Sequence, residues 1–132
     1  MNTKSFIISG FVGGIVNFLL GWVFYGMLFK DSFPQPSESD SSAMAFIAVG
    51  AFSVAFFIAF VFGHWAQIST LKTGAIGGAL IGLFMGIIAN AFARGMDASI
   101  TFERMLIDFA VTIVMYCIVG AVIGLLMGKM KN

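Results

Sequence analysis

The chain has 132 residues, of which 60% are hydrophobic and 10% are charged, and its formal net charge at pH 7 is +1. A soluble domain carries about 25% charged residues, so this composition, with a mean hydropathy of +1.03, excludes an ordinary water-soluble domain. The sequence has no basic patch, which excludes a nucleic-acid-binding protein. The single cysteine, Cys117, cannot form an internal disulfide.

Four long runs lack charged side chains, at 5–29, 41–63, 73–93 and 109–128. Each run has the roughly 20 apolar residues that a membrane-spanning helix needs, and none alternates as the strands of a membrane barrel do. We therefore predict an all-α fold, a single polytopic membrane domain over 1–132 with four transmembrane helices in a compact, glycine-packed bundle. The predicted spans are 5–29, 43–66, 73–94 and 106–128.

The first predicted span is too long for the apolar core of a secretory signal peptide, so we interpret it as an uncleaved signal anchor. Basic residues lie on both sides of the predicted membrane. On the side of the amino terminus are Lys4, Lys72, Lys129 and Lys131, and on the other side are Lys30, Arg94 and Arg104. Because cytoplasmic loops carry an excess of basic residues, this small difference favours two cytoplasmic termini in an integral membrane protein.

Small residues recur at four-residue spacing in three of the predicted helices, and such a row forms an inclined ridge on a helix surface. Close backbone approach over small residues is a main source of helix association in lipid. The sequence therefore predicts helix packing through these glycines, with a glycine-lined passage as the alternative. The predicted packing residues are Gly13, Gly21, Gly74, Gly78, Gly82, Gly86, Gly120 and Gly124.

The second predicted span is rich in phenylalanine and alanine and has few glycines. That composition suits a helix with a broad lipid-facing surface, so we predict that it is the most peripheral of the four. The first and third spans share a partial pattern at an offset of 64 residues, which indicates two repeated helical hairpins of the same orientation, as in parallel membrane repeats.

Polar groups within spans are costly in a bilayer and often mark function. Asn17 lies at the middle of the first run, where its amide is expected to bond to a neighbouring helix; a ligand contact is the alternative. Arg94 and Asp108 are expected on the same face of the membrane, where antiparallel neighbouring helices would bring them together. An interfacial ion pair is one interpretation of this arrangement, and the mouth of an ion-binding site is the other. The candidate polar site comprises Asn17, Tyr25, Asn90, Arg94, Asp108, Thr112 and Tyr116.

Patterns typical of enzymes and metal proteins are missing from the sequence. It has no clustered histidines or cysteines, no nucleophile elbow and no phosphate loop. His64, the only histidine, stands next to Trp65 and is expected to anchor the chain at the interface, with proton sensing as the alternative. We therefore expect a non-enzymatic protein without a cofactor or metal.

The segment Asn17–Phe29 resembles the first helix of a bacterial family of small four-helix integral membrane proteins, a domain of unknown function. The likeness lies in a mid-helix Asn, a Gly, an aromatic–Tyr pair, a small residue and a Phe near the helix end. The matching residues are Asn17, Gly21, Phe24, Tyr25, Gly26 and Phe29. The resemblance implies four spans in the bacterial inner membrane, and no activity.

Three functions are compatible with these observations. The leading hypothesis is a membrane protein that acts through helix–helix association, as a homo-oligomer or as a subunit with a partner in a membrane complex. The alternatives are a small transporter or channel for an ion or apolar solute, and a protein that binds a lipid between its helices. Four-span drug exporters are similar in size, but they depend on a glutamate in the first helix, and here no acidic residue precedes Asp31.

Overall fold

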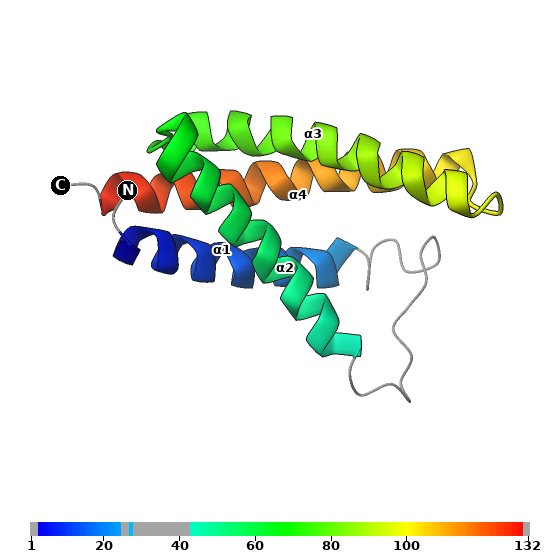
Figure 1. Cartoon of the computed structure of the whole chain (residues 1–132), viewed down its shortest axis with the longest axis horizontal. Helices are drawn as coiled ribbons and strands as arrows, with labels where there is room; N and C mark the ends of the chain where they lie inside the picture. The colour runs from blue at the N-terminus through cyan, green and yellow to red at the C-terminus, as the bar shows by residue number, and fades with distance from the viewer. Residues whose placement is uncertain (1–2, 25–26, 28–42, 131–132) are drawn as a thin grey trace.

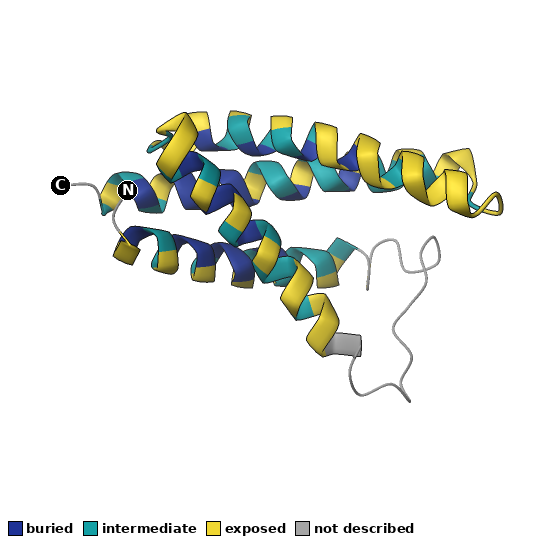
Figure 2. Ribbon diagram, viewed as in Figure 1, coloured by how far each residue is buried: buried dark blue, intermediate teal, exposed yellow. Residues whose placement is uncertain are grey.

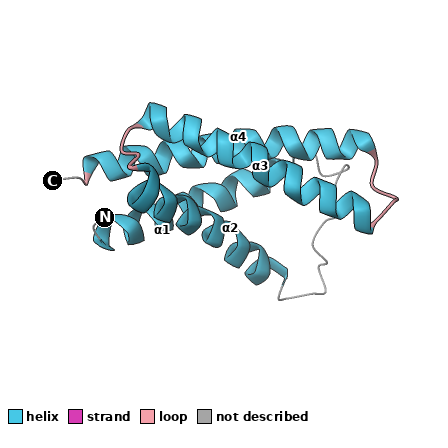
Figure 3. Cartoon of the chain, turned by 45° about the horizontal axis from the view of Figure 1, so that its top comes forward, coloured by secondary structure: helices cyan, strands magenta, loops and turns pink. Residues whose placement is uncertain are grey.

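The computed structural model describes residues 3–24, 27 and 43–130. In this part of the chain the structure has helices and short connections and no strand (Figure 3). The helices are α1 (Thr3–Val23), α2 (Ala43–Phe60), the π-helix η2 (Val61–Ala66) that continues α2, α3 (Leu71–Met96) and α4 (Phe102–Lys129). Four helices are long and apolar enough to cross a membrane, one of them formed by α2 and η2 together.

The predicted all-α bundle of four helices is confirmed. Helices α3 and α4 run side by side in opposite directions, α1 lies along α4, and α2 crosses α1 obliquely (Figure 1). The start of α1, the end of α4 and the link between η2 and α3 lie at one end of the bundle, and the link between α3 and α4 lies at the other. The structure therefore has the up-and-down order that short connections between successive membrane spans require.

The core lies in the half of the bundle that is close to the termini (Figure 2). It is formed by the second half of α2, by η2 and by the second half of α4. Its buried residues are Ala55, Ile58, Ala59, Phe62, Val119, Ile123 and Met127. Toward the link between α3 and α4, exposed residues dominate the ribbon.

The described residues of α2 with η2 and those of α3 include four buried residues each, so the prediction that the second span is the most peripheral stays a prediction. The alanines Ala55 and Ala59 are fully buried and let α2 approach its neighbours closely. The composition rich in phenylalanine indicated a lipid-facing helix, and Phe46, Val49 and Phe57 are indeed exposed. A ring packs equally well on protein, however, and Phe52 and Phe56 lie against α1.

Helix α3 has two distinct faces. Its buried residues are all glycines, Gly74, Gly78, Gly82 and Gly86. On the outer side, large exposed side chains follow the same four-residue spacing, and they are Ile76, Leu80, Phe84, Ile88 and Phe92. Because lipid is as apolar as these side chains, this helix is built to place its small residues against protein and its large ones against hydrocarbon.

The turn between η2 and α3 is closed by the Phe62 carbonyl, which accepts hydrogen bonds from the backbone N–H groups of Gln67 and Ile68. Gln67 has the left-handed conformation, with φ of 55°, which commonly ends a helix. The threonines Thr70 and Thr101 then cap α3 and α4, and each accepts a bond of 3.1 Å from a backbone N–H three residues later. These caps satisfy donors that a helix start leaves free.

Candidate functional site

The glycine row of α3 contacts α4 of the same chain. A Cβ built on Gly78 would lie 3.0 Å from the Cα of Gly120 and closer still to the carbonyl oxygen of Tyr116. One on Gly82 would lie 2.9 Å from the Cβ of Tyr116, and one on Gly86 would lie 2.8 Å from the ring of Phe109. The backbones of the two helices therefore touch directly at Gly78 and Gly82, and Gly86 makes room for the ring of Phe109.

The partner glycines of α4 are equally tight. A Cβ on Gly120 would lie 2.8 Å from the Cα of Gly78, and one on Gly124 would lie 3.0 Å from the Cα of Gly74. Gly74 and Gly78 therefore face Gly120 and Gly124, whereas Gly82 and Gly86 face larger residues of α4, and all of these contacts lie within one chain.

The glycines of α1 face side chains. A Cβ on Gly13 would lie 2.8 Å from the side chain of Ile123, whereas at Gly21 the nearest atom is the Cε of Met115, at 3.6 Å. Gly13 is therefore a tight contact with α4 and Gly21 a loose one.

Sequence reasoning missed two further glycines of α1. A Cβ on Gly10 would lie 2.9 Å from the Cγ of Phe56, and one on Gly14 would lie 2.7 Å from the Cγ of Phe52, with other ring atoms closer. Both phenylalanines belong to α2. The four-residue spacing of the two glycines, and of the two phenylalanines opposite them, was a signal that could have found this interface.

Asn17 of α1 is buried, with 5% of its surface exposed. Its Nδ2 donates a hydrogen bond of 3.1 Å to the carbonyl oxygen of Ala51 in α2. The amide thus links two helices deep in the bundle, where such a bond fixes the position of one helix along the other.

Asn90 and Asp108 form a polar contact between α3 and α4. The Nδ2 of Asn90 donates to the Oδ2 of Asp108 at 2.7 Å and to the carbonyl oxygen of Gly86 at 2.8 Å. Both residues are half-buried. A hydrogen bond from an amide to a carboxylate is strong because it is charge-assisted, so this pair is a polar link between α3 and α4.

Thr112 and Tyr116 follow Asp108 along the same row of α4 and are half-buried. Their backbone and Cβ atoms lie against Gly78 and Gly82, so this row serves first as the surface on which α3 packs. Tyr25, another residue of the candidate polar site, lies outside the described residues.

Arg94 is exposed near the end of α3. Its positive charge acts on Asp97, where the hydroxyl and backbone N–H of Ser99 donate bonds of 2.6 and 3.0 Å to Oδ1. The Ser99 hydroxyl is the main reason that the pKa of Asp97 is below its ordinary value of 3.8, the Ser99 N–H is the next, and Arg104 and Arg94 add to them. The structure thus places Asp108 against Asn90 and gives Arg94 an electrostatic role in the link.

We expect Ser99→Ala to raise the pKa of Asp97 toward 3.8. The pKa of Asp97 is lower in the folded protein than the ordinary value of 3.8. The hydrogen bonds of its carboxylate therefore stabilise the link fully above pH 3.8, and this stabilisation is lost as the pH falls through the folded-state pKa. An NMR titration of the Asp97 carboxyl in micelles measures this. Ser53→Ala, a change on the exposed side of α2, should leave the value unaltered; equal pKa values in wild type and Ser99→Ala would contradict the assignment.

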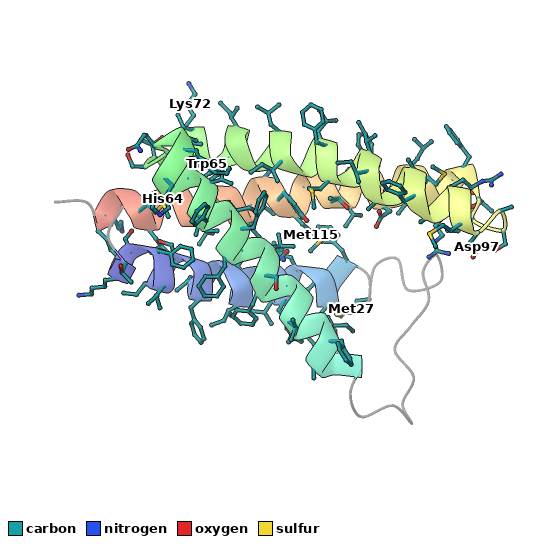
Figure 4. The ribbon with its side chains drawn as sticks, viewed as in Figure 1. Met27, His64, Trp65, Lys72, Asp97 and Met115 are labelled. Atoms are coloured by element: carbon teal, nitrogen blue, oxygen red, sulfur yellow. The ribbon has the colours of Figure 1, made fainter. Side chains whose placement is uncertain are left out.

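The end of the bundle near the termini carries aromatic and basic side chains, including His64, Trp65 and Lys72 (Figure 4). The rings of His64 and Phe60 have centroids 4.6 Å apart, and Trp65 is 74% exposed. An exposed tryptophan at the end of an apolar helix is typical of a membrane interface. In the described part of the chain no three His, Cys, Asp or Glu residues gather as metal ligands would.

No family model, curated protein or solved structure matches this chain. The tight contacts between the helices serve the fold, and the uncovered helix faces are free to meet lipid or another chain.

Proposed function

We propose that this small multi-pass membrane protein is not an enzyme and acts through helix–helix association, as a homo-oligomer or as a subunit of a membrane complex. The buried glycines of α3 and α4 are occupied by contacts within the chain, so association needs another surface. Gly50 on α2 supports the proposal because no heavy atom lies within 4 Å of a Cβ built there. It forms a notch among large exposed side chains such as Phe46 and Val49.

A notch of this kind lets a second helix approach closely, which is how membrane helices associate. The exposed Ser53 stands one turn further along the same helix and offers a hydroxyl for a bond across the interface. The exposed stretch of α2 from Phe46 to Ser53 is therefore the surface that we assign to the partner.

The mass of the purified complex in detergent tests this proposal. We expect more than one chain, and we expect Gly50→Leu to lower the mass to that of a monomer because the added side chain fills the notch. Gly95→Leu is the matched control, since Gly95 is also open but lies at the far end of α3. A wild-type protein that is strictly monomeric and carries no other subunit would contradict the proposal.

A second candidate function is transport of an ion or apolar solute. The Asn90–Asp108 contact favours it, because ionisable groups within membrane helices commonly mark ion pathways. Flux into liposomes should then depend on the carboxylate and be lost in Asp108→Asn. Liposomes that pass no cations, anions or lipophilic cations would exclude this alternative.

We further propose the bacterial inner membrane, with both termini in the cytoplasm. Lys4, Lys72 and Lys129 belong to the end of the bundle that holds the termini, and Arg94 and Arg104 to the other. The positive-inside rule supports this orientation. The resemblance of the first helix to a bacterial four-helix family of unknown function supports the compartment.

A further inference from the structure

Three of the four long helices carry a lysine at the same end of the bundle. Lys4 lies in the first turn of α1, Lys72 in the first turn of α3 and Lys129 in the last turn of α4. These helix ends lie together where α1 begins and α4 ends (Figure 1), and the three side chains are exposed. Positive charge is therefore gathered at one end of the bundle.

Each of these lysines stands at the end of a strip of exposed apolar side chains on its own helix. The members of a strip are spaced by one or two helical turns, so they share one face of the helix. The strips are Ile7, Phe11, Ile15 and Leu19 on α1, Ile76, Leu80, Phe84, Ile88 and Phe92 on α3, and Leu106, Val114, Ile118 and Leu125 on α4. A lysine at the end of a lipid-facing surface extends its ammonium to the headgroup layer. The Lys72 side chain points away from the ribbon of α3 (Figure 4), as this arrangement requires.

The described residues at this end include no aspartate or glutamate. Asp97, Glu103 and Asp108 belong to the part of α3, α4 and their link that lies toward the other end. There the positive charges of Arg94 and Arg104 act on Asp97, so carboxylates of the same chain balance these cations. Among the described residues, net positive charge therefore belongs to the lysine end.

Two of the lysines are held on chain segments that touch. A Cβ built on Gly128 would overlap the carbonyl oxygen of Ser69, so the last turn of α4 lies against the link that precedes α3. Lys129 follows Gly128 directly, and Lys72 is the second residue of α3. The bundle therefore presents Lys72 and Lys129 at the same level, above two neighbouring apolar strips.

We propose that this end of the bundle binds anionic phospholipids, with their phosphate groups on Lys72 and Lys129 and their acyl chains along the strips of α3 and α4. Charge complementarity selects this occupant, because a zwitterionic headgroup brings a cation of its own to a surface that is already positive. Each lysine near the membrane surface enriches an anionic lipid about fivefold. This binding requires neither association of chains nor a particular orientation in the cell.

The two tryptophans of the chain test the proposal because they report on different ends. Trp65 is 74% exposed at the lysine end, and Trp22 is 58% exposed in the last turn of α1, at the opposite end of that helix. Trp22→Phe leaves Trp65 as the source of fluorescence, and Trp65→Phe leaves Trp22. Phospholipids with brominated acyl chains quench a tryptophan that they contact. The measurement adds brominated phosphatidylglycerol, or brominated phosphatidylcholine, to phosphatidylcholine vesicles that hold the full chain.

We expect half-quenching of Trp65 at a mole fraction of phosphatidylglycerol at least about fivefold below that of phosphatidylcholine, and equal quenching of Trp22 by the two lipids. Salt at 1 M should weaken the preference at Trp65, because it shortens the reach of charge to about 3 Å. Equal quenching of Trp65 by both lipids would overturn the proposal. So would an equal preference for phosphatidylglycerol at Trp22.

The double variant Lys72→Gln with Lys129→Gln assigns the preference to the two lysines. Glutamine keeps most of the side-chain length and removes the charge, so the two lipids should quench Trp65 equally in this variant. Arg104→Gln removes one cation from the other end and is the matched control, in which the preference should persist. A preference that survives in the double variant would contradict the assignment.

Discussion

Gly78→Ala is expected to destabilise the protein by about 2–3 kcal/mol, the upper part of the range for forcing an extra group into a packed interior. The added methyl would lie 3.0 Å from the Cα of Gly120 and would overlap the carbonyl oxygen of Tyr116. Both neighbours are backbone atoms, which cannot turn aside as a side chain can. Helices α3 and α4 must therefore move apart, and the contacts of the neighbouring glycines weaken with them.

The free energy of unfolding in mixed micelles, followed by circular dichroism, measures this effect. Gly95→Ala is the control on the same helix, because nothing lies within 4 Å of a Cβ there. That change should be neutral or stabilising by up to about 1 kcal/mol, since alanine is the better helix former. If the two variants are equally stable, the tight contact between α3 and α4 does not hold the bundle together.

Asn90→Leu is expected to cost about 1–2 kcal/mol, at the upper end of the values for side-chain hydrogen bonds between membrane helices. The reason is that the amide of Asn90 donates at 2.7 Å to the Asp108 carboxylate. Leucine has a similar volume and no donor, so it removes the bond with little change in packing.

A double-mutant cycle with Asp108→Leu separates this bond from the other effects of each substitution. We expect a coupling energy of about 1 kcal/mol or more between positions 90 and 108. Additive effects of the two changes would show that the contact adds nothing to stability. A matched cycle between positions 90 and 76 is the control, because Ile76 is exposed on the outer side of α3.

The sequence predicted the elements well because their signals are local. A run without charge, as long as a bilayer is thick, must either form a spanning helix or leave polar backbone groups unpaired in lipid. The four-residue spacing of Gly74, Gly78, Gly82 and Gly86 also indicated which face of α3 is bare.

The candidate site could be predicted only in part. Asn90, Asp108, Thr112 and Tyr116 were placed in one polar group, and the first two are in contact in the structure. The contact itself could not be foreseen, because it depends on how far α3 slides along α4, and that position is set by the glycine contacts as a whole. Because the sequence does not reveal this position, the sequence prediction brought Arg94 and Asp108 together. In the structure Asn90, one turn before Arg94 on α3, contacts Asp108.

By itself, then, the sequence determined that this protein has four apolar helices and that small residues mark one face of three of them. Only the tertiary structure decided which faces meet: the glycine row of α3 on α4, the phenylalanines of α2 over Gly10 and Gly14, and Gly13 of α1 against Ile123 of α4. The physical reason is that lipid and protein interior are equally apolar, so hydrophobicity cannot tell a helix surface that faces acyl chains from one that faces another helix.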